Sequence, residues 1–126
     1  MSQAQQRPSH KELSRKLNVA KNRLNDGEWQ PAFGYEGYGS FMRDCEELNL
    51  LAAPEQAEAL KQVLEELTPS HYAGQHPPLV GSRGDILDKE LFAFILESKF
   101  LGETIYFKFA VDKEQLFIVS FHKARR

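Results

Sequence analysis

The C-terminal stretch of the chain, residues 91–126, restricts the possible fold more than any other part of the sequence. It reads LFAFILESKFLGETIYFKFAVDKEQLFIVSFHKARR, in which apolar and polar residues alternate and Phe, Ile and Val are frequent. This pattern is typical of strands that bury one face and expose the other. We therefore predict a three-stranded antiparallel meander, against which the rest of the chain packs.

The two turns of this meander decide which side chains share a face. Gly102-Glu103 suits a two-residue hairpin loop, because the mirror-type turn needs a residue that tolerates positive φ. A one-residue slip at the second turn, 112–115, would turn over every side chain of the last strand. We expect the register that buries the most aromatic surface, since a buried Phe or Val contributes roughly 1.5–3 kcal/mol. The first turn predicts the cross-strand pairs Leu101 with Thr104, Lys99 with Tyr106, and Glu97 with Lys108.

This register predicts one apolar and one polar face. The apolar core face carries Phe92, Phe94, Leu96, Phe100, Ile105, Phe107, Phe109, Val111, Phe117, Val119 and Phe121. The polar face carries Glu97, Lys99, Tyr106, Lys108, Ser120 and His122, followed by Lys123, Arg125 and Arg126. Antiparallel sheets commonly leave one side in water, so the polar face can be simply solvated. The variety of titratable groups on this face favours a functional surface. The apolar residues at positions 91, 93 and 95 on the same side indicate that the surface is partly covered.

The whole chain, at 126 residues, predicts a single α+β domain in which N-terminal helices pack on the C-terminal sheet. Ser9 and Glu12 form a capping-box sequence at the start of the first helix. Apolar residues at helical spacing continue to about Asn25, and further helices are expected from Ser40 to Leu48 and from Pro54 to Leu67. The expected organisation is residues 1–8 frayed, 9–68 a helical layer, 69–88 a long loop and 89–126 the antiparallel sheet.

Two segments between these elements have more than one interpretation. The aromatic, glycine-rich stretch 28–40 either seals the edge of the core or presents rings that stack on bases. The long loop 69–88 contains His71, Tyr72, His76 and Arg83. It either folds over the polar sheet face or is a disordered connector, because loops of this length are usually functional or mobile.

Composition and charge exclude several classes of protein. The single Cys45 cannot form an internal disulfide and fits a reducing compartment. No apolar run approaches the roughly 18 residues of a membrane span and the polar start lacks a signal-peptide core, so we expect a cytoplasmic protein with no membrane partner. The net charge of −2 argues against a general nucleic-acid coating protein. The sequence has no phosphate-binding glycine motif and no Cys/His spacing suited to zinc, so neither a cofactor nor a metal is expected.

The last two predicted strands carry a resemblance to a known family. TIYFKFAV, followed after a short turn by QLFIVSFHKARR, resembles the motility quorum-sensing regulator (MqsR) toxins. These are small mRNA interferases of toxin-antitoxin systems with a RelE-like fold, in which a Tyr-x-Lys hairpin leads into a final strand close to LIVSF and then a basic residue. The resemblance implies that RNA is the substrate, that a cognate antitoxin is a protein partner, and that the ribosome is a further candidate partner.

The resemblance assigns roles position by position. Tyr106 matches the family's functional tyrosine, and His122 stands where the family has a catalytic lysine. The family's other catalytic lysine, after the third helix, has no equivalent in His71-Tyr72-Ala73-Gly74, and its functional glutamine is not matched. These departures concern activity more than fold.

The residues of the polar face also suit metal-free cleavage of RNA. The reaction needs a base for the ribose 2′-hydroxyl, an acid for the departing 5′-oxygen and cations around phosphorus. We hypothesise that His122 is the acid or base, because imidazole titrates near neutrality, and that Tyr106 or Glu97 is its counterpart. The cations predicted to contact RNA are Lys99, Lys108, Arg125 and Arg83.

Two other classes of function remain open from sequence. The chain can be a non-catalytic binding or regulatory module, a degenerate toxin or an antitoxin-like protein, that docks a partner on the same face. The acidic balance and the missing lysine favour this alternative. A small-molecule enzyme with a pocket between the aromatic stretch and the 69–88 loop ranks third, because Cys45 is expected in the core and no nucleophile motif is present.

Overall fold

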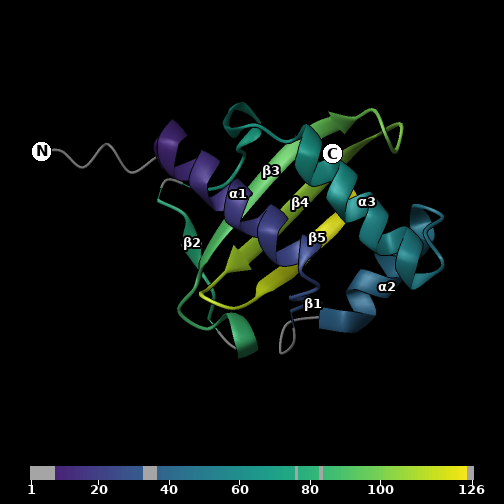
Figure 1. Cartoon of the computed structure of the whole chain (residues 1–126), viewed down its shortest axis with the longest axis horizontal. Coiled ribbons are helices and arrows are strands. Elements are labelled where there is room, and N and C mark those ends of the chain that lie inside the picture. Colours follow the sequence, from purple (N-terminus) through teal and green to yellow (C-terminus); the bar gives the residue numbers. More distant parts are fainter. Residues whose placement is uncertain (1–7, 33–36, 76, 83, 125–126) are drawn as a thin grey trace, which may run out of the picture.

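Three α-helices and a five-stranded mixed sheet form the described part of the computed structural model, residues 8–32, 37–75, 77–82 and 84–124 (Figure 1). The predicted α+β class is confirmed. The frayed segment 1–8 lies outside the described residues except for Pro8, which is buried. The elements in chain order are α1 (His10–Asn25), β1 (Trp29–Pro31), α2 (Gly37–Glu47), α3 (Ala53–Glu66), the 3₁₀ turn η2 (Pro69–His71), β2 (Leu79–Val80), the 3₁₀ turn η3 (Gly84–Ile86), β3 (Glu90–Ser98), β4 (Glu103–Val111) and β5 (Leu116–Lys123).

Helix α1 begins and faces the core as its sequence predicts. The Ser9 hydroxyl accepts a hydrogen bond from the Glu12 amide at 3.0 Å, which satisfies one of the free amides of the first turn. Four side chains at helical spacing are buried against the sheet: Leu13, Leu17, Ala20 and Leu24. The hydrophobic periodicity and the cap therefore specify this helix together.

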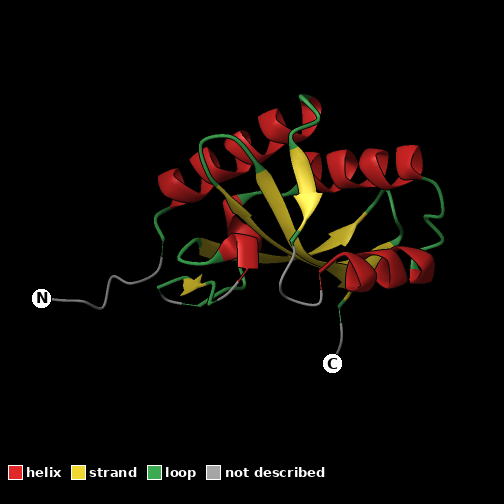
Figure 2. Ribbon diagram, turned by 90° about the horizontal axis from the view of Figure 1, so that it is seen from below, coloured by secondary structure: helices red, strands yellow, loops and turns green. Residues whose placement is uncertain are grey.

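Helices α2 and α3 complete the layer that covers one face of the sheet. In α3 the predicted inward residues Leu60, Val63 and Leu64 are buried. In α2, Phe41 and Cys45 join the same hydrophobic cluster. Figure 2 shows α1 and α3 lying along one side of the sheet. Among the described residues, no helix combines the length and the apolar character needed to cross a bilayer.

The sheet has two strands that the sequence did not reveal, and its order is β1-β5-β4-β3-β2. The predicted antiparallel meander is present as β3, β4 and β5 at its centre. At one edge β1 pairs in parallel with β5, so the sheet is mixed and not purely antiparallel. Trp29 of β1 thereby reaches the helical core, with its ring at 6.0 Å from that of Phe41. This part of the aromatic stretch seals the core edge, whereas Phe33 and Tyr35 lie outside the described residues.

The hairpin between β3 and β4 keeps the predicted faces but not the predicted pairs. Tyr106 pairs with Ile95 instead of Lys99, a displacement that is even in residue number and therefore leaves each side chain on its face. The Glu66 carboxylate accepts hydrogen bonds from the amides of Lys99 and Phe100 at 3.2 and 2.9 Å and holds these residues in a longer loop. Phe100 was expected in the core, yet it is 49% exposed in this loop.

The ladder between β4 and β5 contains a β-bulge. Its register shifts between Lys108 and Phe109, because Ser120 pairs with Lys108 while Ile118 pairs with Phe109. Val119 is the extra residue on β5. A bulge of this kind redirects the side chains that follow it, and bulges are frequent beside functional sites.

Because of the bulge, the first half of β5 presents the opposite side chains to the core from those predicted. Phe121 lies in the core under the helices as expected, but Leu116 and Ile118 accompany it there in place of Phe117 and Val119. Phe117 faces the other side of the sheet and is still buried, since a second hydrophobic cluster lies there. That cluster contains Ala32, Ile86, Leu91, Ala110 and Phe117, with Val119 packed against it.

The segment 69–88, predicted as a long loop, contains two 3₁₀ turns and the short strand β2, and its described part lies along an edge of the sheet. Tyr72 bridges to Phe94, and the Ala73 amide donates to the Ala93 carbonyl at 2.8 Å. Strand β2 then pairs with the start of β3, and Ile86 of η3 covers the second face. The segment therefore runs along β3 and covers part of the polar side, as one of the two interpretations predicted.

Candidate functional site

The second face of the sheet is divided into an apolar half and a polar half. The apolar half is the cluster around Ile86 and Phe117. Beyond the bulge, the same face carries Tyr106 and His122, both partly buried, and Ile95, which is 41% exposed. Side chains alternate between the two faces along β4, and the bulge shifts this alternation along β5. Together these features bring Tyr106 and His122 to one surface.

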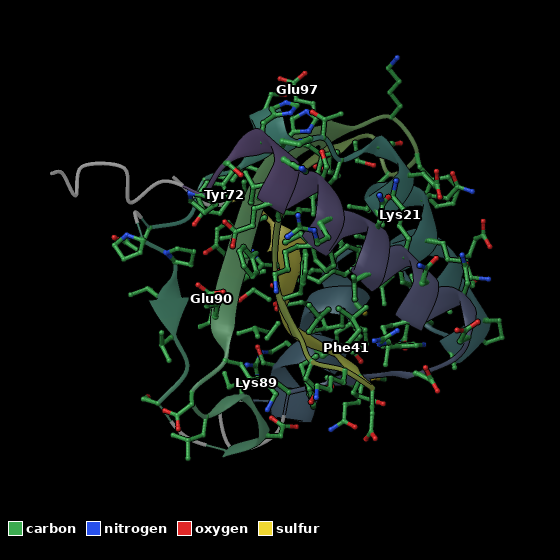
Figure 3. All side chains as sticks on the ribbon, turned by 60° about the vertical axis from the view of Figure 1, so that its left-hand side comes forward. Lys21, Phe41, Tyr72, Lys89, Glu90 and Glu97 are labelled. Atoms are coloured by element: carbon green, nitrogen blue, oxygen red, sulfur yellow. The ribbon has the colours of Figure 1, made fainter. Side chains whose placement is uncertain are left out.

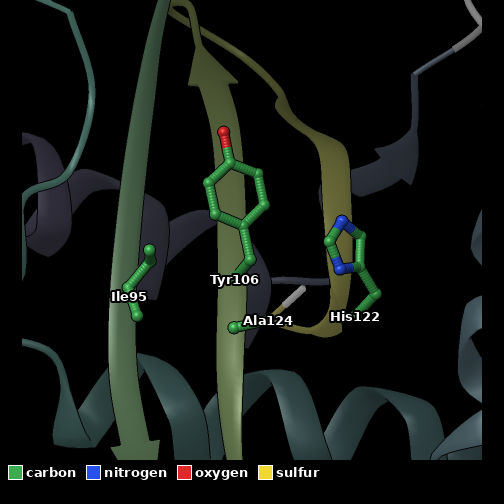
Figure 4. A pocket seen from close by; sticks show the side chains of 4 residues that line it. All are labelled: Ile95, Tyr106, His122 and Ala124. Atoms are coloured by element: carbon green, nitrogen blue, oxygen red, sulfur yellow. The ribbon is translucent and has the colours of Figure 1, made fainter. Parts of the chain in front are cut away.

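Tyr106 and His122 are direct cross-strand partners and their rings stack. The ring centroids are 5.3 Å apart and the planes meet at 26°, within the usual range for stacked aromatic pairs. The two rings line a hollow of about 220 Å³ together with Ile95 and Ala124 (Figure 4). The sequence prediction that this phenol and this imidazole share a side of the sheet is confirmed.

A neighbouring carbonyl selects the tautomer of the neutral His122 ring. Its Nδ1 lies 2.7 Å from the Lys123 carbonyl oxygen. A carbonyl can only accept, so Nδ1 carries the hydrogen of this bond and Nε2 of the neutral ring has a free lone pair. The hydrogen bond also fixes the ring orientation. Nε2 is therefore the atom through which His122 can take or return a proton.

Lys108 lies two residues along β4 from Tyr106, on the same face. Its ammonium nitrogen is 6.0 Å from the centroid of the Tyr106 ring, at the outer limit of a cation-π contact. Burial of the side chain lowers the pKa of the Lys108 ammonium below the usual lysine value of 10.5. Lys108 therefore adds a partly desolvated positive charge next to the Tyr106 and His122 pair.

The other predicted site residues are not gathered in this hollow. Glu97 and Lys99 line a separate hollow of about 290 Å³ with Glu66 and His71. Figure 3 shows Glu97 at the opposite end of β3 from Glu90. Arg83 and Arg125 lie outside the described residues. Of the predicted groups, Tyr106, His122 and Lys108 form the compact set.

Sequence reasoning missed the residues that frame this set. Ala124 closes the hollow beside His122, and the Gly74-Gln75 segment lies beside Lys108. Small and backbone-contributing residues leave no mark in a hydrophobic pattern, so no signal pointed to them. Within the described ranges, no group of three or more His, Cys, Asp or Glu side chains is arranged to hold a metal ion.

Cys45 illustrates a titratable group that lies outside the site. It is fully buried in α2, and burial, reinforced by the negative charge of Asp44, raises the pKa of its thiol from 9.0 to about 12. At pH 8 the thiolate fraction is then roughly a thousandfold smaller than in the unfolded chain. We expect a disulfide reagent such as DTNB to label the native protein very slowly and the denatured protein completely, measured by absorbance. Rapid labelling of native protein, absent in Cys45→Ala, would contradict a core position.

Comparisons with known proteins identify no relative of this chain. No protein-family model, curated protein or solved structure matches it. The resemblance in the last two strands therefore stays a prediction, and the functional argument depends on the geometry of the site.

Proposed function

We propose that this protein is a RelE-like mRNA interferase, the toxin of a toxin-antitoxin pair, which cleaves RNA by acid-base chemistry without a metal. The stacked Tyr106 and His122 pair carries the proposal. A proton donor and an oriented imidazole on one open hollow are the parts that the two proton transfers require, and the nearby Lys108 ammonium supplies positive charge for the RNA backbone.

The proposed reaction assigns one step to each group. His122 Nε2 takes the proton of the ribose 2′-hydroxyl, and the 2′-oxygen attacks phosphorus. The bond from phosphorus to the 5′-oxygen breaks, and the Tyr106 hydroxyl gives that oxygen its proton. The products are a 2′,3′-cyclic phosphate and a 5′-hydroxyl end, so atoms and protons balance. Tyr106 is preferred to Glu97 as the counterpart, because Glu97 lines a different hollow.

A second candidate function is a binding module that uses the same face without catalysis. The observation in its favour is that the hollow beside the two rings is otherwise lined by Ile95 and Ala124, which have no polar side-chain atoms. An apolar-lined hollow beside two rings suits docking of a partner side chain as well as chemistry.

Expression of the full chain in a bacterium separates the two functions. For the interferase we expect growth arrest accompanied by decay of mRNA, and we expect both to disappear in the Tyr106→Phe, His122→Ala double variant. The control is the double variant His10→Ala, Lys113→Gln, which changes an imidazole and an exposed charge away from this face and should still arrest growth. Harmless expression of folded wild-type protein would favour the binding module.

A further inference from the structure

A second, smaller hollow adjoins the proposed catalytic pair. It has a volume of about 60 Å³ and shares Tyr106 with the larger hollow. Gly74 and Gln75 form one side, while Leu91, Ala93 and Lys108 form the side made by the sheet. The two hollows therefore lie next to each other along the surface of β4, with the Tyr106 side chain between them.

The wall formed by residues 73–75 is held in place by specific contacts. The buried Tyr72 packs edge-on against Phe94, with ring centroids 5.7 Å apart, and its hydroxyl donates to the Gln75 carbonyl at 2.6 Å. The Ala73 amide is bonded to β3, as described above. A Cβ atom at Gly74 would lie 2.6 Å from the Tyr72 hydroxyl oxygen, so a larger residue there would displace the Tyr72 ring from its present position. These contacts hold the backbone wall of the small hollow in place.

Lys108 is the charged group of this hollow and has no counter-ion among the described residues. Its side chain is half-buried, with apolar Leu91 and Ala93 and the Tyr106 ring around it. A partly desolvated ammonium without an anionic partner is unfavourable, and the depressed pKa of Lys108 reflects that cost. An anion bound here would supply the favourable charge interaction that the Lys108 ammonium loses when it is removed from water. The small volume suits a phosphate group better than a nucleobase.

We propose that this hollow is a phosphate subsite, in which Lys108 holds the phosphate one nucleotide away from the bond that Tyr106 and His122 cleave. The assignment depends on the proposed function for the identity of the substrate. Its spacing follows from the strand: two residues of β4 separate Lys108 from Tyr106 by about 6.8 Å, a length that one nucleotide can bridge. The preferred substrate therefore carries at least one phosphate next to the scissile one.

Titration with inorganic phosphate tests the subsite without any need for catalysis. The probe is the side-chain NMR signal of Lys108 in lysine-labelled protein that carries His122→Ala. We expect a saturable shift of this signal and an increase in the Lys108 pKa, because a bound anion favours the charged ammonium. In the two variants the titration is followed by the backbone amide signal of Tyr106, and we expect binding to weaken roughly 10–100-fold in Lys108→Met and to be unchanged in Lys113→Met, which removes an exposed charge from the β4–β5 turn. Equal affinities in the two variants would overturn the subsite.

Cleavage of short substrates tests the position of the subsite relative to the reaction. We expect wild-type protein to cleave a dinucleotide with a terminal phosphate at least tenfold faster than the same dinucleotide without it, and we expect this ratio to fall to near one in Lys108→Met. An identical ratio in both proteins would overturn the subsite while leaving the proposed function intact. If wild-type protein cleaves neither substrate nor longer RNA, the proposed function fails, and the phosphate titration still decides whether the hollow binds an anion.

Discussion

Replacing His122 by alanine is expected to lower RNA cleavage by the purified protein by roughly 10²–10⁴-fold, the usual effect of removing a general acid or base. The structural reason is the hydrogen bond from Nδ1 to the Lys123 carbonyl, which leaves Nε2 as the reactive nitrogen beside Tyr106. The measurement is the single-turnover rate on a labelled RNA that wild-type protein cleaves.

A matched control separates chemistry from folding in this experiment. His10→Ala makes the same change at the exposed start of α1 and should leave the cleavage rate unchanged. His122 lies at the surface of the sheet outside the hydrophobic clusters, so we expect His122→Ala to melt close to the wild-type temperature. A decrease in rate of less than about fivefold in the folded variant would remove His122 from the proton transfers.

Replacing Phe121 by alanine is expected to lower the free energy of unfolding by about 3–5 kcal/mol. Phe121 is fully buried under the helices and meets Phe107 edge-on, with ring centroids 5.7 Å apart and planes at 80°. Truncation removes this ring and leaves a cavity between β5 and the helical layer. Urea unfolding followed by circular dichroism measures the loss.

Phe100 is the matched control for this second experiment. The alternation of the sequence predicts both phenylalanines in the core, but Phe100 is 49% exposed in the β3–β4 loop. Phe100→Ala should therefore cost less than about 1 kcal/mol. Similar losses in the two variants would contradict the register that the structure assigns to the hairpin.

The parts of the fold that sequence reasoning predicted are those fixed by local patterns. The cap at Ser9, the buried face of α1 and the antiparallel meander all follow from neighbouring residues. The pairing of Tyr106 with His122 was also within reach, because every even register of the last hairpin keeps the two residues on one face. Fold class and the centre of the site were therefore predictable.

The parts that were missed depend on contacts between distant segments. Strand β1 has three residues, ends in Pro31 and pairs with β5 at the edge of the sheet, so nothing in its own sequence indicates a strand. The β3–β4 register is set by the Glu66 carboxylate at the end of α3, which holds the amides of the loop. A turn rule based on Gly102 alone cannot take this hydrogen bonding into account.

The facing of β5 could not be read from its composition. The run from Leu116 to Val119 is apolar at every position, so both possible phases bury a similar surface. Both sides of the strand are in fact covered over this run, one by the helices and the other by the cluster that contains Ile86 of η3. The cluster that includes Ile86, a residue far away in the sequence, explains why a strand with two buried sides is stable here.

Because Val119 is an extra residue on β5, the face on which His122 lies depends on the number of residues between Phe117 and Phe121. One more or one fewer residue between Phe117 and Phe121 changes the parity of the strand, and the imidazole then points toward α1 and α3 while the phenylalanine points into water. Related chains would therefore keep the number of residues in this short segment even where the residues themselves differ. A gap placed there when two such sequences are compared would pair residues that lie on opposite sides of the molecule.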